Sequence, residues 1–216
     1  MNVVSPLSAG TAQRDPVPDA GIVAAIRPAA VLILAFTALT GLALPLGFVG
    51  VGRAVLPYQA GGSLIERDGK VVGSALIGQA FTGNGYFQGR PSATTDTDPA
   101  DSTKQVPAPY NAAASLASNM GATSKDLAAR VKEAVATAGP APVPADAVTT
   151  SASGLDPHVT PANALRQVAR VAAARKLPED RVRALVAEHT EGRLLGLIGE
   201  PRVNVLALNM ALDAAH

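Results

Sequence analysis

The side chains that could do chemistry gather in one short stretch of the sequence. Asp156 and His158 closely follow three hydroxyl residues, Thr150, Ser151 and Ser153. A carboxylate, an imidazole and a hydroxyl are the components of a serine hydrolase site, if folding brings the three groups together. No Gly-x-Ser-x-Gly elbow marks a nucleophile in this sequence. Two interpretations stay open: a hydrolase site, or a turn in which Asp156 caps the backbone and His158 is a surface or packing residue.

A metal site is the second chemistry to consider. His189 and Glu191 could join His158 as ligands, but the sequence has no His-Glu-x-x-His spacing. The aspartates between positions 96 and 101 alternate like the start of a calcium loop, yet the turn glycine and the distal glutamate are missing. We therefore predict no metal ligand and no catalytic residue, and the sequence leaves any cofactor-binding residue unknown.

A glycine-rich stretch, residues 81–92, holds large recognition-type side chains: Phe81, Tyr86, Phe87 and Arg90. The glycines predict a loop, and their spacing fits neither common nucleotide-binding motif. The aromatic rings could fill a small core, or the loop could bind a small ligand, an ion or a partner. We take these four residues as candidate partner contacts.

The longest uncharged stretch is residues 28–52, bracketed by Arg27 and Arg53. About 20 apolar residues in a helix cross the hydrocarbon core of a bilayer, so this stretch is long enough to span a membrane. A buried core helix is usually shorter, a cleaved signal peptide has a shorter apolar region, and a surface helix needs a charged face. The sequence therefore predicts one transmembrane helix.

Three residues of this span would suit contact with other helices. Gly41 and Gly47 leave room for close approach of a neighbour, and Pro45 removes a backbone hydrogen bond and predicts a kink. We add Gly41, Pro45 and Gly47 to the candidate partner contacts.

The expected fold class is α+β, with the transmembrane helix followed by a mixed domain. Residues 1–27 are predicted to be a disordered tail, 53–139 a β-containing part and 140–216 a helical part. Asp68-Gly69 predicts a hairpin turn within 63–74, and the Thr-, Asp- and Pro-rich segment 93–109 predicts an exposed loop. Prolines 140, 142 and 144 predict a stiff connector.

Three helices are predicted beyond the loops. Ser124 can cap a helix that runs to about Thr137, and Thr160 can cap one that has Pro161 in its first position. Pro178 predicts the start of a further helix. The segment 203–209 has apolar residues on both faces, so it could be an inner strand or the start of a short helix ending near Asp213.

The composition excludes several classes of function. The net charge is only +1 and aromatic residues make up 3% of the chain, which argues against a nucleic-acid-binding face. Cysteine is absent, which excludes disulfides, thiolate catalysis and cysteine-bound zinc. The arginines and lysines on the two sides of the span are too balanced to predict its orientation.

Long, gap-free segments carry a resemblance to a known family. They cover roughly residues 27–213: segments 62–65, 73–93, 110–115, 118–119, 148–158, 199–206, 208–209 and 211–213. In these segments the chain resembles the C subunit of the bacterial Kdp potassium-transporting ATPase. It departs from the family pattern in a longer N-terminal tail and in an insertion around residues 94–106.

The resemblance implies an accessory, non-catalytic subunit of a high-affinity, ATP-driven potassium import complex. Its partners would be a channel-like potassium-binding subunit, a P-type ATPase subunit and a small single-span subunit. The N-terminus would be cytoplasmic, the helix would cross the bacterial inner membrane, and the large domain would be periplasmic or extracellular. The subunit would stabilise assembly or raise the ATP affinity of the ATPase subunit, as a catalytic chaperone, with no tightly bound cofactor of its own. The residues alone leave open a membrane-anchored extracytoplasmic hydrolase or a ligand-binding module.

Overall fold

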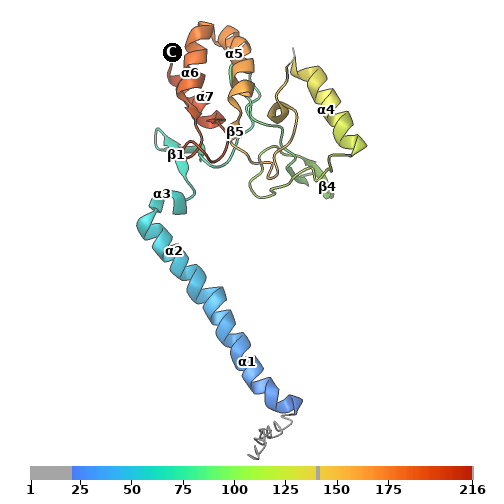
Figure 1. Cartoon of the computed structure of the whole chain (residues 1–216), viewed down its shortest axis with the longest axis vertical. Helices are drawn as coiled ribbons and strands as arrows, with labels where there is room; N and C mark the ends of the chain where they lie inside the picture. The colour runs from blue at the N-terminus through green and yellow to red at the C-terminus, as the bar shows by residue number, and fades with distance from the viewer. Residues whose placement is uncertain (1–20, 140–141, 216) are drawn as a thin grey trace, which may run out of the picture. The chain divides into compact units, whose positions relative to one another are not determined.

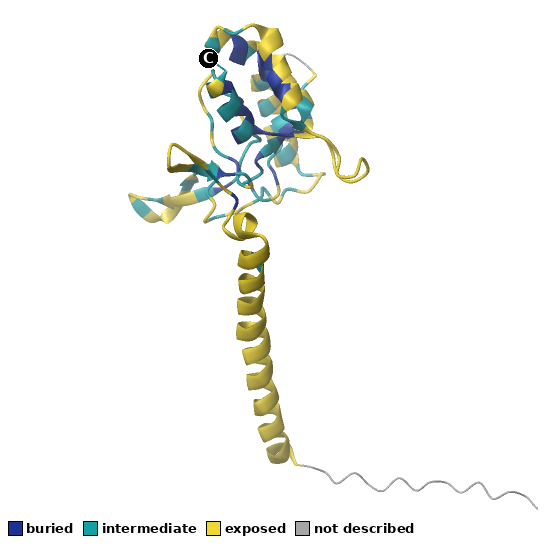
Figure 2. Cartoon of the chain, turned by 90° about the vertical axis from the view of Figure 1, so that its left-hand side faces the viewer, coloured by how far each residue is buried: buried dark blue, intermediate teal, exposed yellow. Residues whose placement is uncertain are grey.

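The computed structural model describes residues 21–139 and 142–215, and the chain divides into two compact units at Pro57. The first unit is one continuous helix built from α1 (Ile22–Ala38), the π-helical turn η1 (Leu39–Ala43) and α2 (Leu44–Val55). These 34 residues are long and apolar enough to cross a membrane, and their side chains are exposed along nearly the whole helix (Figure 2).

The helix begins earlier than the sequence predicted. It starts at Ile22 and includes Pro28, which lacks the amide for one helical hydrogen bond but does not end the helix. Residues 22–27 of the expected tail are therefore helical, and residues 1–20 lie outside the described part of the chain.

The helix accommodates Pro45 with a local change of winding. The amide of Leu44 donates to the carbonyl of Leu39, five residues back, which is the hydrogen bond of a π-helical turn. Pro45 follows this wide turn directly, and such local adjustments are how transmembrane helices satisfy backbone groups beside a proline. The structure thus locates the perturbation at residues 39–43, just before the proline.

The second unit opens with a short helix, α3 (Pro57–Ala60), and the predicted hairpin. Strands β1 (Leu64–Arg67) and β2 (Lys70–Ser74) pair antiparallel, with an irregularity after Ile65. Asp68 and Gly69 have φ angles of 52° and 73°, the two positive values that a tight hairpin turn requires. The prediction of a turn at this dipeptide is confirmed.

The predicted loop at 93–109 is wrong. Strands β3 (Thr95–Asp98) and β4 (Asp101–Pro107) form a second antiparallel hairpin around the Pro99-Ala100 turn. Its composition suggested a loop because most of its side chains are polar and exposed. A strand pair, however, needs only hydrogen bonds between backbones and tolerates threonine well.

The predicted helix caps are confirmed. In α4 (Lys125–Ala138), the Ser124 side chain accepts a hydrogen bond from the amide of Leu127. In α5 (Pro161–Arg175), the Thr160 side chain accepts from the amide of Asn163. Between them lies a 3-10 turn, η2 (Ala145–Ala147); two residues of the predicted proline connector, 140 and 141, lie outside the described residues.

The C-terminal segment combines the two structures that its pattern allowed. A three-stranded antiparallel sheet has the order β5 (His158–Val159), β7 (Arg202–Asn204), β6 (Thr190–Glu191). Helix α6 (Glu179–Glu188) follows Pro178, and α7 (Val205–Ala214) follows β7 directly. The segment 203–209 is therefore the end of a short strand and then a helix, because Asn204 caps α7 through the amide of Ala207.

The core lies where α5, α6 and α7 meet (Figures 1 and 2). Val168, Val171, Val186 and Leu208 are almost completely buried there. Phe87, from the loop far away in sequence, is also completely buried in the same cluster. The fold is mixed α and β, and the parts before and after residue 140 share one core.

Asn209 of α7 fixes Phe87 in this core. Its side-chain oxygen accepts from the amide of Phe87 at 2.8 Å, and its side-chain nitrogen donates to the carbonyl of Phe87 at 2.9 Å. Both residues are buried, so neither backbone group can turn to water instead.

Replacing Asn209 with leucine should lower the free energy of unfolding by about 2–4 kcal/mol, because two buried backbone groups lose their partners. Urea unfolding of the full chain in detergent measures the change. Asn84→Ala, at an exposed asparagine, is the matched control and should change stability by no more than about 0.5 kcal/mol. Equal effects of the two variants would show that the Asn209 hydrogen bonds do not stabilise the fold.

Candidate partner-contact site

The predicted loop 81–92 has no regular secondary structure, as expected. Its aromatic residues differ in how far they are buried. Phe87 is completely buried and is a core residue, which removes it from the set of partner contacts. Phe81 and Tyr86 pack with their ring centroids 5.5 Å apart, and the Arg175 guanidinium lies 4.5 Å from the centre of the Tyr86 ring. Both are only partly buried, so these two rings retain surface on the outside of the domain.

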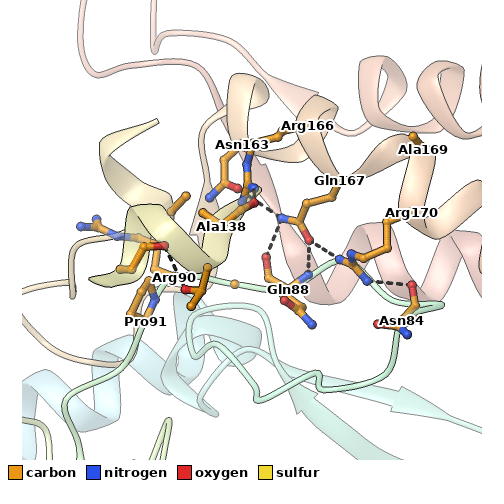
Figure 3. Close-up of a pocket in the computed structure, with 14 residues that line it drawn as sticks. Asn84, Gln88, Arg90, Pro91, Ala138, Asn163, Arg166, Gln167, Ala169 and Arg170 are labelled. Atoms are coloured by element: carbon orange, nitrogen blue, oxygen red, sulfur yellow. Dashed lines mark hydrogen bonds between the residues drawn. The ribbon is translucent and has the colours of Figure 1, made fainter. Parts of the chain in front are cut away.

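Side chains of α5 hold the backbone of this loop (Figure 3). Arg170 donates to the carbonyls of Asn84 and Tyr86 at 2.7 and 3.1 Å, and Arg175 donates to the carbonyl of Gly85 at 2.7 Å. Gln167 accepts from the amide of Gln88 at 2.8 Å and donates to its carbonyl at 3.0 Å. These side-chain hydrogen bonds satisfy backbone amides and carbonyls of the loop, as pairing with a neighbouring strand would do in a sheet.

Arg90 lies at the other end of the loop and pairs with Asp156 at 3.1 Å. It also donates to the carbonyl of Thr150 at 3.2 Å, while its own carbonyl accepts from the Tyr110 hydroxyl at 2.6 Å. Burial, together with the nearby Asp156 carboxylate, raises the pKa of Tyr110 to about 12, although Arg90 acts in the opposite direction. Arg90 thus connects two segments of the domain and is only partly exposed.

Asp156 and His158 come together in a capped turn. The Asp156 carboxylate lies 3.6 Å from the His158 ring and accepts from the His158 amide at 3.0 Å, which caps the turn between them. Ser153 instead accepts from the amide of Leu155, and Ser151 is buried. In the described part of the chain, no hydrogen bond joins a serine to His158. The capping interpretation of Asp156 is the one that the geometry supports.

The two residues of the second candidate pair, His189 and Glu191, each contact another group of the domain. His189 ends α6, where its ring contacts the carbonyl of Leu185 at 3.0 Å, and Glu191 in β6 pairs with Arg202 at 2.7 Å. The three aspartates of the second hairpin each accept bonds from neighbouring backbone amides: Asp96, Asp98 and Asp101. Among residues 21–139 and 142–215, no group of three acidic or histidine side chains could hold a metal ion.

A cavity of about 780 Å³ lies between α4, α5 and the loop (Figure 3). Its charged lining residues are Arg90, Arg166 and Arg170. Arg166 donates to the carbonyl of Ala138, and burial, together with the nearby Arg166, lowers the pKa of Arg170. These arginines already bind carbonyl or carboxylate oxygens of the domain. The charged groups that line the cavity therefore stabilise the fold.

In the helical unit, the predicted contacts do not share one face. Gly41 and Pro45 are four positions apart, whereas Gly47 follows Pro45 by two positions, about 200° around α2 at 3.6 residues per turn. A methyl group added at Gly47 or Gly50 would have nothing within 4 Å of it, so side chains there would meet only what surrounds the helix. The small residues thus open two faces to neighbours.

Sequence reasoning missed four exposed residues between β6 and β7: Leu194, Leu195, Leu197 and Ile198. They form a tight turn closed by two backbone hydrogen bonds between Leu194 and Ile198. The available signal was an apolar run, Leu194 to Ile198, outside any predicted helix or strand and flanked by Arg193 and Glu200.

Comparisons with known proteins agree on one family. The family model described as K+-transporting ATPase, c chain (KdpC) matches residues 26–214. The chain is 62% identical over 194 residues to the potassium-transporting ATPase KdpC subunit of Rhodopseudomonas palustris, covering 88% of this chain and 98% of that protein. It is 63% identical over 191 residues to the KdpC subunit of Methylorubrum extorquens, covering 87% and 95%.

Asp156 should stabilise the domain in a pH-dependent manner. Burial raises the pKa of this carboxyl, but hydrogen bonds from His158 and Arg90 outweigh burial and leave the pKa below its ordinary value. A lowered pKa stabilises the fold above the ordinary value of about 4, and this stabilisation is lost as the pH falls towards the folded-state pKa. Asp156→Asn should therefore cost about 1–2 kcal/mol at pH 7, and progressively less as the pH falls from about 4 towards the folded-state pKa.

Urea unfolding of the full chain between pH 3 and pH 7 measures this difference. The control is Asp68→Asn, in an exposed turn whose positive φ suits asparagine, and it should change stability by no more than about 0.5 kcal/mol. An Asp156→Asn effect that stays constant with pH would contradict the stabilising role of the charged carboxylate.

Proposed function

Because the chain belongs to the KdpC family, the c chains of K+-transporting ATPases, we propose that it is a non-catalytic accessory subunit that stabilises an ATP-driven potassium import complex. The observation that carries this proposal is the 34-residue apolar helix, whose side chains are exposed in the chain by itself. A helix with glycines on two faces is suited to close packing against more than one neighbouring helix.

The proposed neighbours are the other subunits of the complex: a channel-like potassium-binding subunit, a P-type ATPase subunit and a small single-span subunit. Gly41 and Pro45 would contact one neighbour and Gly47 another. Tyr86, Phe81 and Arg90 remain proposed contacts of the second unit because each keeps some exposed surface.

ATP binding is proposed to belong to the ATPase subunit alone. The loop 81–92 has no phosphate-binding spacing, and the arginines of the cavity between α4, α5 and this loop bind oxygens of this chain. Any rise in the ATP affinity of the ATPase subunit would then act indirectly, through the assembled complex.

The large unit is proposed to lie outside the cytoplasm of a bacterial inner membrane, with the N-terminus inside. The charges beside the helix do not favour either direction, so this orientation follows from the family resemblance. An external domain could stabilise the complex or cover the entrance for the ion, but it could not reach ATP in the cytoplasm.

External protease should digest residues 58–216 in right-side-out membrane vesicles, and immunoblotting of an epitope at the C-terminus measures the loss. The same protease applied to inverted vesicles is the control and should leave the epitope intact. Protection in right-side-out vesicles would place the unit in the cytoplasm and contradict the external role.

Gly47→Leu should reduce co-purification of the complex subunits at least tenfold, because the new side chain would keep a neighbouring helix at a distance. The fold of the chain itself should not change, since nothing in the chain lies near the added group. Leu46→Met, in the same apolar helix and about 100° around it from both Gly47 and Pro45, is the matched control. Full assembly with Gly47→Leu would exclude this face as a helix contact.

A further inference from the structure

A second apolar surface lies far from the membrane helix in sequence. Residues 193–200, which we call the leucine tip, expose four large apolar side chains: Leu194 at 63%, Leu195 at 84%, Leu197 at 83% and Ile198 at 62%. The Leu194 amide donates to the Ile198 carbonyl at 2.9 Å, and the Ile198 amide donates back at 3.0 Å. The tip is thus a closed turn that presents its side chains outwards in a fixed arrangement.

The backbone of the tip is unfavourable for its own sequence. Leu195 has a φ of 54° and Gly196 a φ of 75°. Glycine, asparagine and aspartate adopt positive φ more readily than leucine, whose Cβ crowds the backbone. Because the Leu195 side chain is also largely exposed, its own domain gives no reason for leucine at this position. An exposed, strained residue of this kind points to a contact outside the chain.

The charges around the tip argue against a lipid surface. Arg193 pairs with Glu200 at 2.8 Å, and Arg202 pairs with Glu191 at 2.7 Å. No lysine or aromatic residue occurs between positions 190 and 204. Segments that bind membrane interfaces usually combine apolar residues with unpaired basic residues, tryptophan or tyrosine. A neutral, purely aliphatic tip suits an apolar pocket in a protein.

We propose that the leucine tip inserts into an apolar pocket on another subunit of the potassium-transporting ATPase complex. This inference rests on the proposed function, because it takes its partner from the complex. A second copy of the same chain is a poorer partner, since Arg90 lines each of four cavities of this chain, and one of them also contains Arg166 and Arg170. A convex apolar tip with a pre-formed backbone loses little conformational freedom when it binds.

The first test is a tip variant of the full chain, Leu195→Asn with Leu197→Asn. Asparagine tolerates the positive φ at position 195, so thermal unfolding of the variant should match that of the wild-type chain. Its affinity for the remaining, detergent-solubilised subunits of the complex should fall at least tenfold. Leu76→Asn, at a leucine that is also 63% exposed, is the matched control and should bind within twofold of the wild type.

The outcomes separate the two proposals. If the wild type binds and the tip variant binds equally well, the role of the tip is overturned while the accessory function stands. If the wild-type chain does not bind the other subunits at all, the proposed function is overturned, and the proposal for the tip fails with it.

A second test identifies what the tip contacts. The chain has no cysteine, so Leu197→Cys provides a unique thiol for the environment-sensitive dye bimane. Its emission should shift to the blue when the other subunits are added. A blue shift in phosphatidylcholine and phosphatidylglycerol vesicles that hold only the labelled chain would indicate lipid, and one caused by excess unlabelled chain would indicate self-association. Either result, or no shift in any sample, would overturn the proposal.

Discussion

The irregular backbone of residues 84–92 is the constraint on which the domain depends. A segment without secondary structure that enters a core must still satisfy its amides and carbonyls. Here side chains from other elements do so: Gln167 and Arg170 from α5 and Asn209 from α7. Each of these bonds joins residues at least 79 positions apart, so the N-terminal and C-terminal parts of the unit depend on each other for stability.

The same constraint explains why polar residues that resemble candidate site residues in the sequence instead stabilise the fold. Arg90 and Asp156 neutralise each other beside the loop, and Asp156 also caps the turn that leads into β5. Arg170 and Arg175 hold loop carbonyls. A guanidinium with several donors in a fixed plane is well suited to bind carbonyls of an irregular segment. The polar side chains around the loop therefore serve the fold, and the surfaces left for partners are mainly apolar.

Features that depend on neighbouring residues could be predicted from the sequence. Contacts between residues far apart in the sequence could not. Asp68-Gly69, Ser124 and Thr160 determine backbone geometry within a few residues, so the turn and the two caps were predictable. The hairpin at 95–107 was missed because its strands are polar and depend on each other for pairing. The burial of Phe87 depends on Asn209, 122 positions away, and no local pattern reports such a contact.

The exposed apolar residues were the hardest to interpret because they lack partners within the chain. The long apolar helix was recognisable by its length, whereas the leucine tip is too short to carry a periodic signal. Leucine in the left-handed region costs about 1 kcal/mol or more, which a domain tolerates only if a contact elsewhere offsets it. Once the helix is inserted in the same membrane as its partners, the tip binds as a second site on a tethered chain. Its effective concentration is then high, so that a contact that is weak by itself can still stabilise the complex, provided that both sites can be engaged at once.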